Sequence, residues 1–153
     1  MYEKLLGIDL GTRSVHVSDG EKPISFISEK LNNRSKEISF LFDCFTDVFG
    51  LSWRGYIEEP VVAGVRNLRV SLQIAQVAGA LMSTGSGRLV PVTQWKKEVV
   101  GKGNANKMYV AKWFKDNHPQ LHAKIEGQQD LVDASCIHLY AVKIDSAKDR
   151  IYV

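Results

Sequence analysis

The sequence predicts an α/β protein with one mixed five-stranded sheet flanked by helices, in which a three-stranded antiparallel meander joins parallel strands. Short extended runs separated by turn residues come first in the chain, and they are typical of a meander. Amphipathic helical patterns then alternate with extended runs, and a helix that connects two strands implies parallel pairing. The extended runs are residues 5–12, 15–18, 23–27, 53–58 and 88–93, and the first two helical patterns are residues 33–49 and 67–83.

Length and composition predict a single domain over residues 1–153. With 44% hydrophobic and 24% charged residues, the 153-residue chain can form one full core. No stretch approaches the roughly 18 consecutive apolar residues of a membrane span, and the N-terminus lacks the pattern of an export signal. We therefore expect a cytoplasmic protein with no membrane partner. Cys44 and Cys136 lie within apolar helical patterns, which predicts reduced core thiols.

The first extended run, Leu5-Leu6-Gly7-Ile8-Asp9-Leu10-Gly11-Thr12, places a carboxylate inside an apolar strand. Burying an ionised aspartate without a partner costs several kcal/mol, so such a residue usually holds a metal, a cation or hydrogen-bond donors. Gly11 and the polar residues after it turn the chain into the run 15–18, which predicts a hairpin. Asp9 is therefore the first functional candidate.

Turn residues set the bounds of the later elements. Gly50 is a natural end for the first helix, and Pro60 prevents the strand that ends at Glu58 from continuing in a sheet. Gly85-Ser86-Gly87 is expected to end the second helix, and Gly101-Lys102-Gly103-Asn104 to form a flexible break. Further helices are expected from Met108 to about Asp116 and from Gln129 to about Ile144.

Four acidic side chains are predicted to converge at one edge of the sheet. Asp9 and Glu58 lie near the carboxyl ends of two strands, where such sheets bind ligands. Asp130 and Asp133 share one helix face, although capping of the helix start is an alternative role for this pair. Four carboxylates repel one another unless cations neutralise them. The set therefore predicts one or two Mg²⁺ ions, with Mn²⁺ as a substitute; two are expected, because a pair of ions suits phosphodiester hydrolysis.

The basic residues are concentrated in one segment. Residues 88–124 contain eight basic and two acidic residues, whereas the whole chain has a net charge of only +3. This asymmetry indicates a protein that grips a polyanion around a carboxylate site. A solvated helix face is the alternative explanation of the charge.

Four segments carry a resemblance to a known family. They are Gly-Ile-Asp9-Leu-Gly-Thr-Arg, Ile57-Glu58 with its following loop and helix, Val99-Val-Gly-Lys-Gly-Asn-Ala-Asn-Lys107, and Asp130-Leu-Val-Asp133-Ala. In this order and spacing the chain resembles the RuvC-type Holliday-junction resolvases over nearly its whole length. The resemblance implies a ribonuclease H-like fold and a homodimer with the helix 67–83 in its contact. It also implies symmetric cleavage of two strands of a four-way DNA junction.

The resemblance assigns roles to individual residues. Asp9, Glu58, Asp130 and Asp133 would hold the metal ions. Lys107 would stabilise the scissile phosphate, and Lys96 matches a second family lysine that is linked to DNA contact and catalysis. The residues expected to contact DNA are Lys96, Lys97, Lys102, Lys107, Arg66 and Arg69, with solvated helix-start positions as the alternative for the two arginines.

Two positions leave a choice or depart from the family. Glu59 follows Glu58, and neighbours on a strand point to opposite faces, so only one faces the metals; the family position favours Glu58. Bacterial members have a base-contacting aromatic residue where this chain has Val61. We therefore expect a relaxed sequence preference and activity on other branched DNA. The four histidines lack metal-ligand spacing, so none is expected to have a direct role, and His138 is expected to be packed or at the surface. The three tryptophans are expected in the core or an interface, with DNA contact as the alternative for Trp95.

Three other functions compete with that of a DNA endonuclease. The opening motif also resembles the first phosphate motif of actin-like ATPases, but those proteins need two such domains and this chain has one. A ribosomal-RNA-processing nuclease of the YqgF type shares the motif, and a non-catalytic junction-binding module is the third alternative. The Glu58 loop, the lysine-bearing glycine turn and the Asp130/Asp133 pair favour the resolvase.

Overall fold

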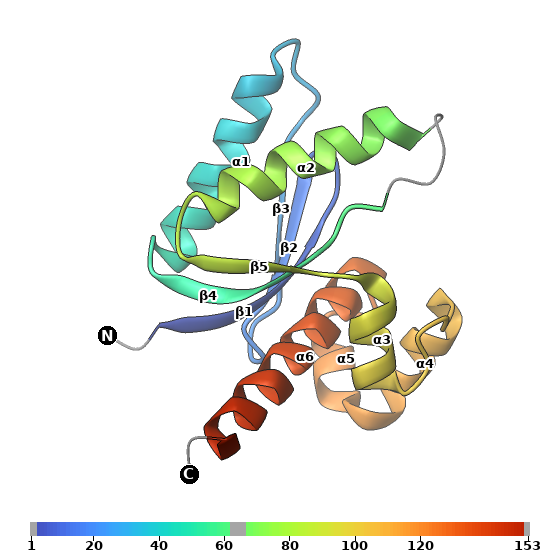
Figure 1. Cartoon of the computed structure of the whole chain (residues 1–153). Helices are drawn as coiled ribbons and strands as arrows, with labels where there is room; N and C mark the ends of the chain where they lie inside the picture. The colour runs from blue at the N-terminus through green and yellow to red at the C-terminus, as the bar shows by residue number, and fades with distance from the viewer. Residues whose placement is uncertain (1–2, 62–66, 152–153) are drawn as a thin grey trace.

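The centre of the protein is a five-stranded sheet of order β3-β2-β1-β4-β5, seen in a computed structural model that describes residues 3–61 and 67–151 (Figure 1). The pairs β1–β2 and β2–β3 are antiparallel, whereas β1–β4 and β4–β5 are parallel. This confirms the predicted mixed sheet. The strands are β1 (Lys4–Leu10), β2 (Ser14–Ser18), β3 (Ile24–Ile27), β4 (Trp53–Glu58) and β5 (Ser86–Val90).

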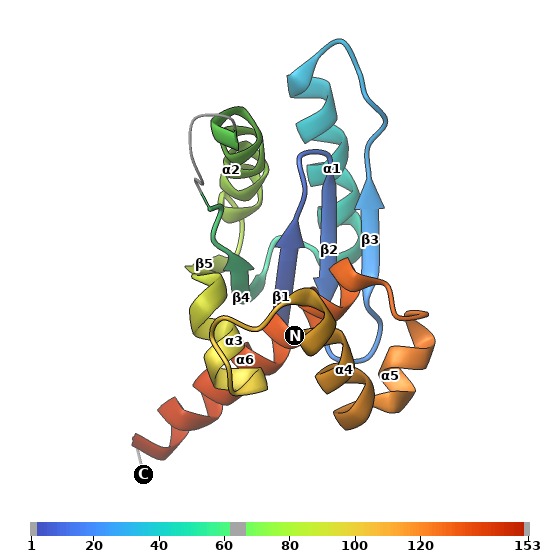
Figure 2. The same ribbon diagram turned by 90° about the vertical axis from the view of Figure 1, so that its right-hand side faces the viewer.

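Helices cover both faces of this sheet. The helices α1 and α2 lie on one face, and α3, α4, α5 and α6 lie on the other (Figures 1 and 2). Each face has its own hydrophobic core. The helices are α1 (Arg34–Phe49), α2 (Leu68–Met82), α3 (Val92–Val100), α4 (Lys107–Asn117), α5 (Pro119–Lys124) and α6 (Gln129–Ile151).

Alternation along β1 decides which face receives Asp9. Leu6 and Ile8 are fully buried in the core beneath α1 and α2, together with Trp53 of β4. Successive strand residues point to opposite faces, so Gly7 and Asp9 face α6 instead. The apolar positions of β1 therefore fix the carboxylate of Asp9 on the face covered by α6.

Helix α6 packs directly on the backbone of β1 at Gly7. A Cβ atom built on Gly7 would run into the backbone of Ala134 and His138 of α6. Only glycine permits this approach without moving the helix. Since Asp9 lies two residues beyond Gly7, the same contact brings the first turns of α6, with Asp130 and Asp133, to the carboxyl end of β1.

The predicted bounds of the early helices hold closely. Helix α1 begins after Asn33, whose side chain accepts a hydrogen bond from the backbone N–H of Lys36 at 3.2 Å, and it ends at Gly50 with φ 73°. Helix α2 agrees with the predicted range to within one residue at each end. Its preceding loop, residues 62–66, lies outside the described residues.

The region after α2 differs from the prediction. The fifth strand is Ser86–Val90 rather than residues 88–93, and it is followed at once by α3, which the sequence did not predict. Pro91 has φ −61° and cannot donate to a strand ladder, but it can precede a helix, so the chain leaves the sheet there. Gly87, expected to end the second helix, instead pairs with Gly55 in the β4–β5 ladder, and the indole ring of Trp53 occupies the space that a side chain there would need.

Two further differences concern the second half of the chain. The six-residue helix α5 was not predicted; it starts at Pro119 and has no buried residue, so it leaves no apolar pattern. Helix α6 continues to Ile151, beyond the predicted end near Ile144. Cys44 and Cys136 are free thiols, as predicted. Among the described helices, none combines the length and the apolar character that crossing a membrane would need.

Candidate active site

Asp9 and Glu58 lie side by side at the carboxyl ends of two parallel strands. The last paired residues of β1 and β4 in register are Ile8 and Ile57, and the two acids come next on each strand. Asp9 is 8% exposed, and its carboxyl group lies close enough to Glu58 for the charge of Glu58 to raise the pKa of Asp9. The structure thus brings together the two strand acids that the sequence placed on neighbouring strands.

The two acids of α6 face this pair. Asp133 is half-buried, and its Oδ1 accepts a hydrogen bond from Gln129 Nε2 at 2.8 Å. Asp130 is more open, with a side chain that is 65% exposed. The charges of both residues act on Asp9. All four predicted acids therefore gather around the end of β1, with Asp9 the most deeply buried of them.

Burial and mutual repulsion make these carboxylates hard to ionise. Burial raises the pKa of Asp9 well above its ordinary value, and the charges of Glu58 and Asp133 raise it further. Burial also raises the pKa of Glu58, and it raises that of Asp133 to about 6. A group of acids that suppress one another's charge in this way is suited to binding a cation, because the cation favours every ionised form.

Trp95 and Lys96 of α3 partly counteract the rise in the pKa values of these carboxylates. The indole Nε1 of Trp95 donates to Glu58 Oε1 at 2.9 Å, and this bond lowers the pKa of Glu58. The ammonium of Lys96 donates to the carbonyl oxygen of Ala105 at 2.9 Å, and its charge favours the ionised forms of Glu58 and Asp133. The helix that the sequence did not predict therefore supplies one hydrogen-bond donor to Glu58 and one positive charge that acts on Glu58 and Asp133.

Trp95→Phe tests whether this indole positions Glu58. The substitution keeps an aromatic ring in the core but removes the donor to the carboxylate, so we expect cleavage to need roughly 10-fold more Mg²⁺ for half-maximal rate, as when a partner of a metal ligand is lost. The matched control is Trp53→Phe. Trp53 is also fully buried, but its Nε1 donates to Thr84 Oγ1 at 3.0 Å on the other face of the sheet. An equal Mg²⁺ requirement in both variants would contradict the positioning role.

His16 lies beside the acids, although the sequence analysis expected no direct role for it. It pairs directly with Asp9 across the β1–β2 hairpin and is 7% exposed. Its Nδ1 lies 2.7 Å from Ser25 Oγ, and its Nε2 lies 3.1 Å from Ser14 Oγ and 3.5 Å from Asp130 Oδ2. Burial lowers the pKa of His16, so the neutral ring is favoured. The sequence contained a signal for this position: if residues are paired outward from the predicted turn at Gly11, with Leu10 opposite Val15, His16 falls opposite Asp9.

The remaining predicted residues are spread around the acids. Glu59 does not face Asp9: it lines a separate pocket with Pro60 and Pro91. Lys107 is exposed at the start of α4, and the charges that shift the pKa values of the acids do not include its own. Lys97, Lys102 and Arg69 are exposed on α3, on the following loop and on α2, whereas Arg66 lies outside the described residues.

The donor set fits a hard divalent cation. In residues 3–61 and 67–151, no three histidine, cysteine, aspartate or glutamate side chains already surround one metal position. Mg²⁺ does not need such a cage, since it usually binds one or two carboxylates and completes its octahedron with water and substrate phosphates. Asp9 and Glu58 supply two adjacent carboxylates, and Asp133 lies close enough to raise the pKa of Asp9.

The architecture defines the class of the fold. A mixed sheet of order β3-β2-β1-β4-β5 with helices on both faces is the ribonuclease H-like fold, in the form found in RuvC. The structure of Thermus thermophilus RuvC matches with a TM-score of 0.63 and 15% sequence identity, over 88% of this chain and 90% of that chain.

A second solved structure gives the same result. T. thermophilus RuvC in complex with a Holliday junction substrate matches with a TM-score of 0.66 and 14% identity, again over 88% of this chain and 90% of that chain. No protein-family model matches the sequence, and no curated protein matches it. At these identities the likeness establishes the shared fold.

Proposed function

We propose that this chain is a Mg²⁺-dependent, structure-selective DNA endonuclease that resolves four-way junctions by symmetric phosphodiester hydrolysis. The observation that carries the proposal is the contact between Asp9 and Glu58 at adjacent strand ends, with Asp133 and Asp130 of α6 facing them. The fold shared with RuvC, one structure of which contains a Holliday junction substrate, supports a branched DNA substrate. Mn²⁺ is the expected substitute for Mg²⁺.

The protein groups divide the work of hydrolysis. Asp9, Glu58, Asp130 and Asp133 would hold the metal ions, and Trp95 and Gln129 orient two of these carboxylates. When bound, two Mg²⁺ ions lower the pKa of an attacking water and stabilise the leaving oxygen. Lys96 offsets the negative charge of the carboxylates next to the phosphate. The basic residues of α3, α4 and the loop between them attract the DNA to this edge.

Lys107 is proposed to reach the scissile phosphate when DNA is bound, because it stands exposed at the first position of α4. Lys107→Gln should lower the single-turnover cleavage rate about 100-fold while changing junction affinity much less, since it removes charge that acts on the transition state. Lys112→Gln is the matched control. Its ammonium lies on the same helix but is paired with Asp116 at 2.7 Å. Equal rates in the two variants would remove Lys107 from the mechanism.

The two-fold symmetry of a four-way junction suggests a homodimer as the active form. Helix α2 supports this, because Leu68 and Leu72 lie one turn apart on one face of it and are 42% and 56% exposed. Apolar side chains gathered on one helix are typical of a surface that a partner covers. Sedimentation velocity in the presence of junction DNA should give the mass of two chains, and a monomer at concentrations that support cleavage would exclude the dimer.

The experiment that best tests the function compares cleavage of matched four-way junction, fork, flap and duplex DNA with Mg²⁺ or Mn²⁺. We expect paired nicks at symmetric positions in the junction, slower cleavage of forks and flaps, and none of duplex. Since Val61 replaces the aromatic residue expected in the family, cleavage sites should show little sequence preference.

Two outcomes of this panel would replace the proposal. Cleavage of structured RNA in preference to junction DNA would favour an RNA-processing nuclease. Tight junction binding without cleavage in either metal would favour a non-catalytic binding module. A strong preference for one tetranucleotide would leave the function intact but contradict the role given to Val61.

A further inference from the structure

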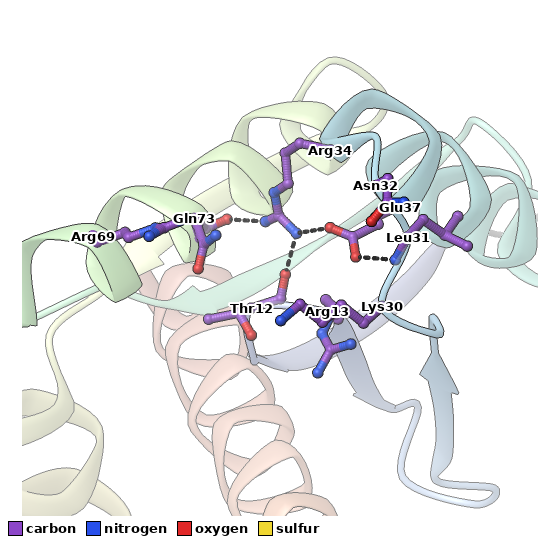
Figure 3. Close-up of a pocket in the computed structure, with 9 residues that line it drawn as sticks. All are labelled: Thr12, Arg13, Lys30, Leu31, Asn32, Arg34, Glu37, Arg69 and Gln73. Carbon is purple, nitrogen blue, oxygen red and sulfur yellow. Dashed lines mark hydrogen bonds and ion pairs between the residues drawn. The ribbon is translucent and has the colours of Figure 1, made fainter.

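A polar cavity lies on the opposite face of the sheet from Asp9, at the same end of β1. Its volume is about 490 Å³, and it is enclosed by the β1–β2 turn, the segment before α1, and the first turns of α1 and α2 (Figure 3). We call it the hairpin pocket and define it by Arg13, Lys30 and Arg69, which line it together with Arg34 and Glu37.

Arg34 forms the rigid wall of the hairpin pocket. Its guanidinium donates to the carbonyl oxygens of Thr12 at 2.6 Å and Gln73 at 2.7 Å, and to Gln76 Oε1 at 2.9 Å. These bonds tie the β1–β2 turn to α1 and α2, as Figure 3 shows for Thr12 and Gln73. Since its donors are engaged by the protein, Arg34 builds the cavity rather than binding a ligand in it.

Glu37 is the acid that lines the hairpin pocket, and both of its carboxylate oxygens have partners within the protein. It is 5% exposed, and its Oε2 accepts a hydrogen bond from the backbone N–H of Leu31 at 2.9 Å, while Oε1 lies 3.3 Å from Arg34 Nη1. The bond from Leu31, the contact with Arg34 and, last, the charge of Arg13 lower the pKa of Glu37. The charges of Arg34 and Glu37 therefore cancel within the wall.

Three cations of the hairpin pocket are left without such partners. Within the described residues, the side chains of Arg13, Lys30 and Arg69 have no hydrogen bond and no ion pair; the half-buried Arg13 acts on Glu37 only through its charge. Three like charges around one cavity repel one another unless an anion enters it. Two guanidinium groups and an ammonium are the donors that best match the oxygens of a phosphate.

The position of the hairpin pocket identifies the source of that phosphate. Arg13 follows Asp9 by four residues, so the pocket and the acids lie at the same edge of the sheet. Helices α3 and α4, whose sequences include Lys96, Lys97 and Lys107, lie on the face of the sheet that Asp9 occupies, and the hairpin pocket lies on the other face. A nucleic acid backbone that crosses this edge meets cations on both sides of the carboxylates, which offset their repulsion of DNA.

We propose that the hairpin pocket binds a backbone phosphate of the DNA away from the scissile bond. This inference rests on the proposed nuclease function and extends it to a second contact, on the α1 and α2 face of the sheet. It gives Arg69 a defined role and adds Arg13 and Lys30 to the DNA-binding residues.

The first test compares two charge-matched double variants, Arg13→Gln/Lys30→Gln and Lys22→Gln/Lys124→Gln. Lys22 and Lys124 line a different pocket, beside the turn at the other end of β2. Junction dissociation constants are measured over a series of KCl concentrations in EDTA, so that no cleavage occurs. We expect the pocket variant to bind more weakly at low salt and to flatten the slope of log K against log [salt] by ~1–2, and the control pair to leave the slope unchanged.

The second test uses inorganic phosphate alone. Titration followed by the backbone amide shifts of Thr12 and Leu31 should saturate in the wild-type chain and disappear in Arg13→Gln/Lys30→Gln. The variant Arg13→Lys, which retains the charge, should recover binding and rule out a folding defect. Absence of saturation in the wild-type chain would overturn the phosphate site.

The two tests separate the inference from the proposed function. Wild-type junction binding and cleavage with an unchanged salt slope in the pocket variant would overturn the inference and leave the nuclease standing. Phosphate binding together with an unchanged DNA slope would assign the pocket to a free phosphate compound and also overturn it. A wild-type chain that neither binds nor cleaves branched DNA would defeat the nuclease proposal, whatever the phosphate titration shows.

Discussion

Asp9→Asn is expected to abolish junction cleavage, by on the order of 10³-fold or more, while junction binding stays the same or tightens. Asp9 lies beside Glu58, and the charges of Asp133 and Asp130 also raise its pKa. Its carboxylate is therefore the central ligand of the proposed metal site. The amide retains the shape of the side chain but supplies no charge to a cation. Removing a negative charge also reduces the repulsion of DNA.

The measurement is a single-turnover cleavage assay on a labelled four-way junction, with affinity determined separately in EDTA. Asp133→Asn should behave in the same way. Glu59→Gln is the matched control, because Glu59 neighbours Glu58 in sequence but lines a different pocket. The thermal midpoint of Asp9→Asn should equal or exceed that of the wild-type chain, since a buried and repelled carboxylate is removed. Cleavage that survived both asparagine variants would refute the site.

Gly7→Ala is expected to lower the free energy of unfolding by about 3 kcal/mol, at the upper end of what overpacking usually costs. The new methyl group would meet the backbone of Ala134 and His138, and backbone atoms of a packed helix cannot swing away as a flexible side chain can. In a chain of this size the loss corresponds to a fall in thermal midpoint of roughly 6–12 °C. Thermal and urea unfolding followed by circular dichroism would measure it.

Gly79→Ala provides the opposite control. Gly79 lies within α2, and a Cβ built there meets nothing within 4 Å. Alanine is favoured over glycine inside a helix, so this variant should gain about 0.5–1 kcal/mol. If both variants had the same stability, the close packing of α6 on β1 would not be a determinant of the fold.

The strand part of the site was predictable because its signals are local. A charge inside an apolar run marked Asp9, and a strand stopped by Pro60 marked the neighbourhood of Glu58. Parallel pairing then required the two strand ends to meet at one edge, and the structure places them side by side. Strand alternation allowed only one of Glu58 and Glu59 to face the metals, and the family resemblance favoured Glu58; the structure turns Glu58 towards Asp9.

The contributions of α3 and His16 were not read from the sequence. Helix α3 has nine residues and buries only Trp95 and Val100, too few to produce a clear helical period, so the bond from Trp95 to Glu58 was missed. His16 has no partner at metal spacing along the chain, and its partners come from β1, β3 and α6. Such contacts depend on distance in space and leave no pattern in a single segment.

The sequence by itself determined the mixed sheet, the helices that connect its strands and the four acids, since apolar periodicity and turn residues act over a few neighbouring positions. Only the tertiary structure decided how closely the acids approach and which residues support them. The packing of α6 on Gly7 sets the position of Asp130 and Asp133, and the fold of the β1–β2 turn against α1 and α2 creates the hairpin pocket. Both depend on segments far apart in the chain meeting at backbone distance, which no local pattern encodes.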